Sequence, residues 1–186
     1  DKNSADATGS MENQVYAFDV AQTLTPNAYI RTGYTFTGWN TKADGSGTKY
    51  SNQQEVENLT SSANDVITLY AQWKANAYTV NFNKNATDAT GSMNPQPFTY
   101  DQSQPLTENG FSKVGYLFDK WNTKSDGSGT SYADKEIVTN LTTKQSGIVN
   151  LYAQWNPIHY TIKFDPNTDY ATGSMTDQSF VYDESQ

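Results

Sequence analysis

The sequence predicts a mainly β or α+β protein with little helix, built from tandem copies of one small unit. The evidence is a fixed internal period. The seven residues at 33–39, Gly-Tyr-Thr-Phe-Thr-Gly-Trp, return as Gly-Tyr-Leu-Phe-Asp-Lys-Trp at 115–121, an offset of 82 residues. The motif Thr-Gly-Ser-Met occurs three times with the same offset, at residues 8–11, 90–93 and 172–175. A fixed period is the signature of a repeat array, and the alternation of apolar and polar residues within the repeated motifs is typical of strands.

The period divides the chain into two repeats and part of a third. Repeat one covers residues 1–73 and lacks a counterpart of the strand that opens the next copy; repeat two, residues 78–155, is complete; and residues 160–186 form a partial repeat three. The connecting residues, 74–77 and 156–159, are too few for a flexible tether. Short linkers restrict the geometry of neighbouring units, so we expect a rod-like array.

Repeat one is expected to contain three strands, at residues 15–18, 34–40 and 66–73. The strand at 34–40 is the clearest, because Tyr34 and Phe36 alternate with threonines. Gly9, in the connection before the first of these strands, is expected to adopt a positive φ.

Repeats two and three extend the same pattern. Residues 78–82, Tyr-Thr-Val-Asn-Phe, predict a strand with one apolar and one polar face. Residues 160–164 and 180–182 predict two strands of a hairpin in repeat three. A lone hairpin is only marginally stable in water, so we expect this one to require a partner.

The large apolar side chains are few, so each matters for the core. We expect the core to include Phe36, Leu69, Trp73, Phe82, Phe118, Leu151 and Trp155. Strict alternation places Trp39 and Trp121 opposite the Tyr-Phe face. One alternative is an exposed aromatic platform that stacks on a sugar ring. The alternative we favour is burial by strand twist or a neighbouring loop, because a unit this poor in apolar residues needs its tryptophans inside.

Composition excludes several classes of function. A net charge of −8 leaves no basic stripe for nucleic acid, and no apolar run approaches the 18 or so residues that would insert into a membrane. There are no cysteines and the one histidine is His159 in a linker, so a histidine-based triad and a thiolate metal site are both ruled out. The carboxylates mostly differ between copies. We therefore expect no enzyme and no cofactor.

Two acidic loops are candidates for calcium. Asp44 and Asp126 each open the sequence Asp-Gly-Ser-Gly-Thr. A calcium loop supplies several carboxylates, whereas each copy here has one, so a tight turn is the better interpretation and a weak calcium site the alternative.

Four motifs in order, Tyr-Thr-Val-x-Phe, Gly-Tyr-x-Phe-x-x-Trp-Asn-Thr, Asp-Gly-Ser-Gly-Thr-x-Tyr and Leu-Tyr-Ala-Gln-Trp, closely resemble the Listeria–Bacteroides repeat, the family of the internalin B-repeat. The resemblance covers nearly all of the chain. It implies a small β-grasp-like unit in tandem on secreted or wall-attached bacterial proteins, located outside the cell. It also implies a stalk or adhesion module that contacts neighbouring repeats and a host or cell-surface protein or glycan, with no catalytic residues.

The ends of the chain suggest a further alternative. Repeat one lacks the strand that repeat three carries in surplus, so the hairpin of one molecule could complete the next by strand addition, head to tail. The simpler interpretation, which we favour, is a longer array of which this is a part.

Overall fold

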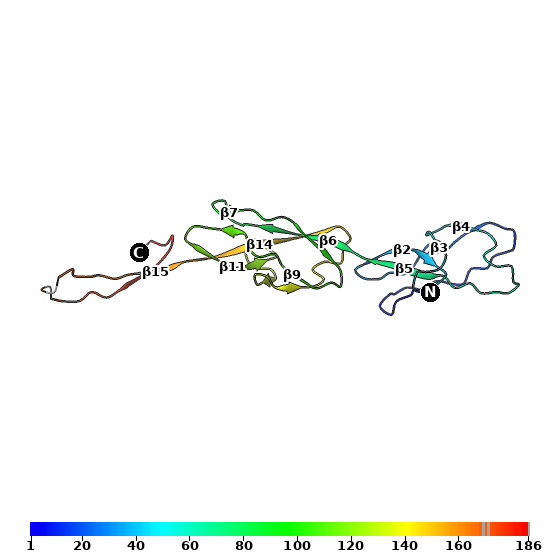
Figure 1. Cartoon of the computed structure of the whole chain (residues 1–186), viewed down its shortest axis with the longest axis horizontal. Coiled ribbons are helices and arrows are strands. Elements are labelled where there is room, and N and C mark those ends of the chain that lie inside the picture. The colour runs from blue at the N-terminus through cyan, green and yellow to red at the C-terminus, as the bar shows by residue number, and fades with distance from the viewer. Residues whose placement is uncertain (169, 171, 186) are drawn as a thin grey trace. The chain divides into compact units, whose positions relative to one another are not determined.

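The computed structural model describes residues 1–168, 170 and 172–185, and that part of the chain is built from strands and turns with no helix (Figure 1). The mainly β prediction is therefore confirmed. Within the same residues there is no helix long and apolar enough to cross a membrane.

The chain forms two compact units whose limits differ from those of the sequence repeats. The first comprises Asp1–Tyr78, Phe98–Gln102 and Thr139–Gly147, and the second comprises Thr79–Pro97, Ser103–Val138 and Ile148–Gln186. Repeat one is thus packed together with two short segments that belong in sequence to repeat two. Residues 74–77, expected to be a linker, are almost entirely strand: β5 (Tyr70–Ala75) ends and β6 (Ala77–Asn83) begins on either side of the buried Asn76.

Repeat one contains one three-stranded antiparallel sheet and one short ladder. The sheet has the order β3-β2-β5, and the ladder pairs β1 with β4. The strands not yet defined are β1 (Gln22–Thr23), β2 (Tyr34–Asn40), β3 (Lys49–Tyr50) and β4 (Glu55–Val56). The prediction of a strand at 34–40 matches β2 residue for residue. Gly9 has a φ of 95°, as expected for the connection that it occupies.

A β-bulge in the middle of β2 reverses the alternation of its side chains. Phe36 lies opposite Trp73, but the next pair is Gly38 with Gln72, so Thr37 is the extra residue. One extra residue shifts all that follow to the other face. Trp39 therefore lies on the face of Phe36, and their ring centroids are 4.9 Å apart.

The core of repeat one is built around that indole. Trp39 is 5 % exposed and clusters with Leu24, Val56 and Ala71. Phe36, Leu69 and Trp73 are half-buried and pack against this cluster, together with further side chains of the repeat: Met11, Tyr16, Tyr29, Tyr50 and Leu59. The rings meet edge to face, as aromatic side chains prefer.

Repeat two contributes a five-stranded sheet of order β12-β11-β14-β6-β8. Its strands, apart from β6, are β8 (Gln96–Thr99), β11 (Tyr116–Asn122), β12 (Ser131–Tyr132) and β14 (Gly147–Pro157). Two short ladders flank it, β7 (Thr90–Gly91) with β10 (Phe111–Ser112) and β9 (Gln104–Pro105) with β13 (Ile137–Val138). The strand predicted at 78–82 is confirmed as part of β6.

The core of this second unit repeats the plan of the first. A bulge between Phe118 and Lys120 again turns Trp121 inward. Trp121 is 0 % exposed, and its ring centroid is 4.9 Å from those of both Phe82 and Phe118. Leu151 is fully buried.

The relative burial of the tryptophans is the reverse of what alternation suggested. Trp73 and Trp155, placed most firmly in the core from the sequence, are only half-buried. Each donates its Nε1 hydrogen to a backbone carbonyl oxygen, that of Lys2 at 2.9 Å and that of Lys84 at 2.8 Å. At the border of the core, the Nε1–H of each indole can reach a backbone carbonyl. The bulge in β2 turns Trp39, rather than Trp73, into the interior.

The strand predicted at residues 15–18 is wrong for repeat one. These residues form no strand, and Val15 and Phe18 are 87 % and 63 % exposed. The counterpart in repeat two, β8, pairs with β6. The described residues of repeat one include no equivalent of β6, so the segment has no neighbour with which to form a ladder.

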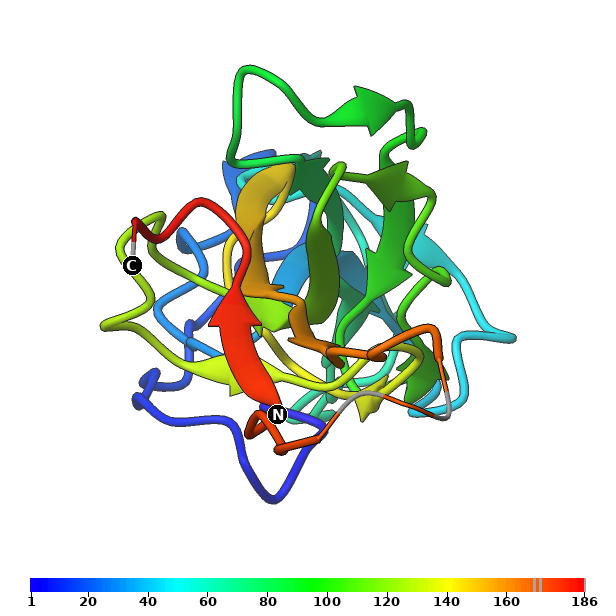
Figure 2. The ribbon, with the colours of Figure 1, turned by 90° about the vertical axis from the view of Figure 1, so that its left-hand side faces the viewer.

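Repeat three forms the predicted hairpin, drawn in orange and red in Figure 2. Its strands are β15 (His159–Ile162) and β16 (Gln178–Val181), which pair antiparallel. Tyr160 stacks on Phe180 with centroids 5.4 Å apart, yet Tyr160 remains 47 % exposed. The hairpin falls within the second compact unit, and residues 169, 171 and 186 of the predicted repeat three lie outside the described residues.

Candidate functional site

The Asp-Gly-Ser-Gly loops are tight turns closed by their own aspartates. Oδ1 of Asp44 accepts a hydrogen bond of 2.9 Å from the backbone N–H of Ser46, and Oδ1 of Asp126 accepts an identical one from Ser128. These backbone bonds, the largest influence on either carboxyl, lower its pKa. Gly45, at a φ of 78°, supplies the left-handed residue that the turn requires.

The calcium alternative gains no further ligands from the fold. The described residues contain no group of three or more His, Cys, Asp or Glu side chains that could hold a metal ion. Oδ1 of each aspartate is bonded to the backbone of its own turn, as in an Asx turn.

Sequence reasoning missed Asn40 and Asn122, the residues that organise these loops. Both are 0 % exposed, and a polar side chain buried to this degree normally has hydrogen-bond partners. Nδ2 of Asn40 donates to the carbonyls of Gly45 and Gly47 at 3.0 and 3.2 Å. Its Oδ1 accepts from the N–H groups of Lys42 and Gly47 at 2.9 and 3.0 Å. The signal was present in the sequence, because an Asn follows the Trp in both copies.

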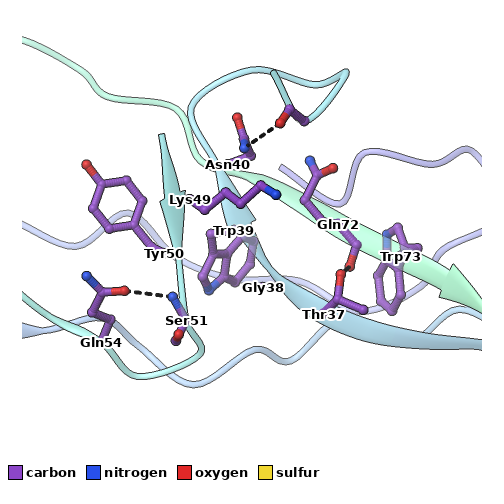
Figure 3. A pocket seen from close by; sticks show the side chains of 11 residues that line it. Thr37, Gly38, Trp39, Asn40, Lys49, Tyr50, Ser51, Gln54, Gln72 and Trp73 are labelled. Atoms are coloured by element: carbon purple, nitrogen blue, oxygen red, sulfur yellow. Dashed lines mark hydrogen bonds between the residues drawn. The ribbon is translucent and has the colours of Figure 1, made fainter. Parts of the chain in front are cut away.

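A hollow of repeat one lies over the bulge of β2 and has a volume of about 520 Å³ (Figure 3). In Figure 3 the indole of Trp39 lies between Tyr50 on one side and Trp73 on the other. The remaining lining is polar, with hydroxyl, amide and ammonium groups from Thr37, Asn40, Lys49, Ser51, Gln54 and Gln72. Such a lining is suited to a polyol more than to an apolar ligand.

The lining of this hollow is specific to repeat one. At the offset of 82, Lys120 takes the place of Gly38, Ser131 the place of Lys49, and Glu136 the place of Gln54. Gly38 has a φ of 138°, and a Cβ added there would lie 2.8 Å from the carbonyl oxygen of Tyr50, so the bulge of repeat one requires a glycine where repeat two has Lys120.

The proposed stacking platform of Trp39 and Trp121 is not formed. With 5 % and 0 % exposure, neither indole presents a face to solvent, and a sugar ring needs such a face to stack. The bulge, which strict alternation did not anticipate, is the reason. His159, the single histidine, is exposed at the start of β15.

The residues common to both repeats make the same internal contacts. The amide of Asn122 bonds to Gly127 and Gly129 at 3.0 and 3.2 Å, the two distances found for Asn40. Trp155 bonds to a backbone carbonyl just as Trp73 does. The residues that the two repeats share therefore form the core and fix the loops.

Comparison with known proteins agrees with this plan. The model of the Listeria-Bacteroides repeat domain matches residues 3–72 and 78–154, one match in each repeat. The chain is 39 % identical over 139 residues to a protein described as a Gly-rich membrane protein of Evansella cellulosilytica. It is 34 % identical over 152 residues to Internalin H of Listeria monocytogenes, and 29 % identical over 152 residues to a further protein from E. cellulosilytica, described as a membrane protein.

These alignments cover most of this chain but little of the relatives. They take in 74 %, 80 % and 79 % of the chain, and 16 %, 24 % and 21 % of the three relatives. No solved structure matches the chain. With both repeats matched by the family model, the chain belongs to the Listeria-Bacteroides repeat family.

Proposed function

We propose that this chain is a non-catalytic repeat segment of a bacterial surface protein, located outside the cell, where it acts as a spacer that holds another part of that protein away from its anchor. The membership of the family and the names of the relatives, two membrane proteins and an internalin, support the surface location. The relatives extend well beyond the aligned segment, as expected for a spacer that carries other domains.

The observation that carries the proposal is where the shared side chains lie. Between the two copies the period keeps Trp39 and Trp121, Asn40 and Asn122, and the Asp-Gly-Ser-Gly turns, and each of these serves the interior or a loop. A recurrent catalytic or ligand-binding site would instead preserve polar groups that face solvent.

The mechanism is geometric. A unit of about 80 residues has a diameter of roughly 30 Å, so each added repeat should extend the segment by about that length. The acidic exterior, with its net charge of −8, keeps such an array soluble.

Small-angle X-ray scattering tests the spacer directly. The chain is compared with a version into which a second copy of residues 78–159 is inserted after residue 159, so that the period of 82 is kept. The maximum dimension should grow by roughly 30 Å. An unchanged maximum dimension, with the extra copy folded, would overturn the proposal.

A second candidate function is favoured by the hollow over the bulge of β2. Its amide, hydroxyl and ammonium groups, with the half-buried rings of Tyr50 and Trp73 at its sides, suit a saccharide. The test is titration of the chain with soluble fragments of bacterial cell-wall polysaccharide, following the indole N–H signal of Trp39 by NMR. Lys49→Ser, which installs the residue of repeat two and removes the ammonium group from the lining, is the matched variant and should weaken any shift. No shift in the unsubstituted chain would end this candidacy.

A further inference from the structure

A short edge of repeat one is in contact with a corner of the following repeat, inside the first compact unit. The edge is Gly33–Tyr34, where β2 begins, and the corner is Tyr100–Asp101, where β8 has just ended. The rings of Tyr34 and Tyr100 meet edge to face with centroids 5.9 Å apart. The hydroxyl of Tyr34 donates a hydrogen bond of 2.9 Å to Oδ2 of Asp101.

Backbone hydrogen bonds join the edge and the corner through Asn76. The N–H of Asn76 donates to the carbonyl of Gly33, and the N–H of Tyr100 donates to the carbonyl of Asn76, both at 2.9 Å. Gly33 has no side chain, and a Cβ added there would lie 2.2 Å from the ring of Tyr100. The tyrosine ring thus occupies space that the glycine leaves free.

A cation also lies against the ring of Tyr34. The guanidinium of Arg31 lies 3.6 Å from the ring centroid of Tyr34, and its Nε donates to Asp6 at 3.0 Å. The cation faces the aromatic ring, an attractive arrangement. The bond to Asp101 raises the pKa of the Tyr34 hydroxyl, since the carboxylate stabilises the protonated phenol.

The contacts between edge and corner recur 82 residues later, inside the second compact unit. The hydroxyl of Tyr116 donates to Oδ2 of Asp183 at 3.1 Å, and the rings of Tyr116 and Tyr182 are 5.8 Å apart. Ile158 takes the place of Asn76 and makes both backbone bonds, at 2.8 and 3.0 Å. Lys113 lies over Tyr116 as Arg31 lies over Tyr34.

The corner is also formed in repeat one, where the described residues supply no edge that contacts it. In repeat one its counterpart is Phe18–Asp19, and Phe18 is 63 % exposed. Asp19 nevertheless adopts a φ of 53° and bonds to Asn58 through both its N–H and its carboxylate. Asp101, which is docked, has a φ of 61° and the same two bonds to Asn140. A partner that is already ordered loses little conformational entropy on docking.

We propose that the Gly33–Tyr34 edge is a docking site for the Tyr-Asp corner of the following repeat, and that this contact couples the local opening of repeat one to the folding of repeat two. The Phe18–Asp19 corner has the same conformation, and the partner that fits it is the Gly-Tyr edge of another repeat of this family. Stability in such an array is the sum of each repeat and its contacts with its neighbours.

The coupling goes beyond the spacer function and does not depend on what the segment holds or binds. A chain that fails to lengthen in the scattering experiment could still show coupling, and a chain that lengthens could lack it.

Hydrogen exchange of single amides tests the coupling. Tyr100→Ala, a change in repeat two, should speed exchange of the Asn76 amide, which belongs to the edge side, by roughly 10-fold or more, because opening of this contact then costs less. Tyr182→Ala is the matched control. It should spare Asn76 and speed exchange of the Ile158 amide by a similar factor.

A milder variant covers the case in which Tyr100→Ala disrupts repeat two itself. Tyr34→Phe keeps the ring and removes the hydroxyl that bonds to the carboxylate, a charge-assisted bond. Exchange of the Tyr100 amide should rise by roughly 10-fold, while amides of β14 stay as they were. The proposal is overturned if Tyr34→Phe leaves the Tyr100 amide unchanged, or if Tyr100→Ala speeds exchange in repeat two alone.

Discussion

Asn40 holds the backbone of Gly47 through both ends of its amide: Nδ2 donates to the carbonyl oxygen at 3.2 Å, and Oδ1 accepts from the N–H at 3.0 Å. Asn122 does the same to Gly129, at 3.2 and 3.0 Å. The residue that follows the buried Trp thus closes the loop between two strands. The core and the turn are fixed by adjacent residues.

Replacing Asn40 by Ala should lower the free energy of unfolding of repeat one by about 2–4 kcal/mol, because four hydrogen bonds are lost and the buried loop groups keep no replacement. Chemical denaturation followed by tryptophan fluorescence measures this. Asn52→Ala, at an exposed position that makes a single bond to the N–H of Asn27, is the control. Equal losses for the two variants would contradict the role given to Asn40.

Truncation of the tryptophans should reveal their unequal burial. Trp121→Ala should destabilise repeat two by about 3–5 kcal/mol, since a fully buried indole is removed from a ring cluster. Trp155→Ala should cost less, because that side chain is only half-buried. Denaturation midpoints of the two variants check the order. The opposite order would restore the ranking that strict alternation suggested.

A methyl group at Gly33 should cost more than backbone strain alone. Gly33→Ala meets the ring of Tyr100 at 2.2 Å and also forces a non-glycine residue to a φ of 77°. Gly173→Ala imposes a similar positive φ, 105°, with nothing within 4 Å. The control should lose about 1–2 kcal/mol, and Gly33→Ala should lose clearly more in a thermal unfolding experiment. Matching losses would show that the ring yields without cost.

Acid should weaken the two Asp-Gly-Ser-Gly turns. The pKa of Asp44 and of Asp126 is lowered by the backbone N–H that each accepts. A carboxyl whose folded pKa lies below its unfolded value of about 3.9 contributes stability that is fully present above that pH and is lost as the pH falls through the folded pKa. NMR titration of the carboxyl carbons, in buffer and in urea, should give lower values in buffer. Asp44→Asn keeps the acceptor oxygen and should remove this pH dependence from its loop.

Calcium should leave these turns unchanged. Extracellular calcium modules bind at about 0.1–1 mM, so calcium chloride at about 5 mM is a sufficient challenge. The backbone signals of Ser46 and Ser128 should not move, because each loop supplies a single aspartate, and its Oδ1 already accepts a hydrogen bond within the turn. A saturable shift that EDTA reverses would instead establish the calcium site.

Much of the fold could be predicted because it depends on short-range patterns. Alternation located β2 and β6, and Gly9 was placed in a turn of positive φ from composition alone. The bulge in β2 was not predicted, although a glycine in the middle of a strand, here Gly38, often marks one. Without the bulge, strict alternation places the side chain of Trp39 on the wrong face of the strand.

The remainder depends on contacts between residues distant in sequence. The segment at 15–18 has a strand-like sequence, but a strand needs a neighbour, and its partner in the complete repeat is β6. The bond from Tyr34 to Asp101 spans 67 residues. A period of 82 indicates which residues are equivalent in each copy, but it does not indicate that one copy contacts the next through them.

Asn76 gives the junction between the two repeats a means of discrimination. Its buried side chain donates to the carbonyl of Thr143 and accepts from the hydroxyl of Thr35, both at 2.7 Å. At the next junction Ile158 and Leu117 stand where Asn76 and Thr35 do. If the repeats were joined in another order, Asn76 could face a junction without these two partners. Its buried amide would then lack hydrogen bonds, at a cost of about 1–3 kcal/mol. The two junctions therefore differ in polarity, and this difference favours one order of the repeats over another.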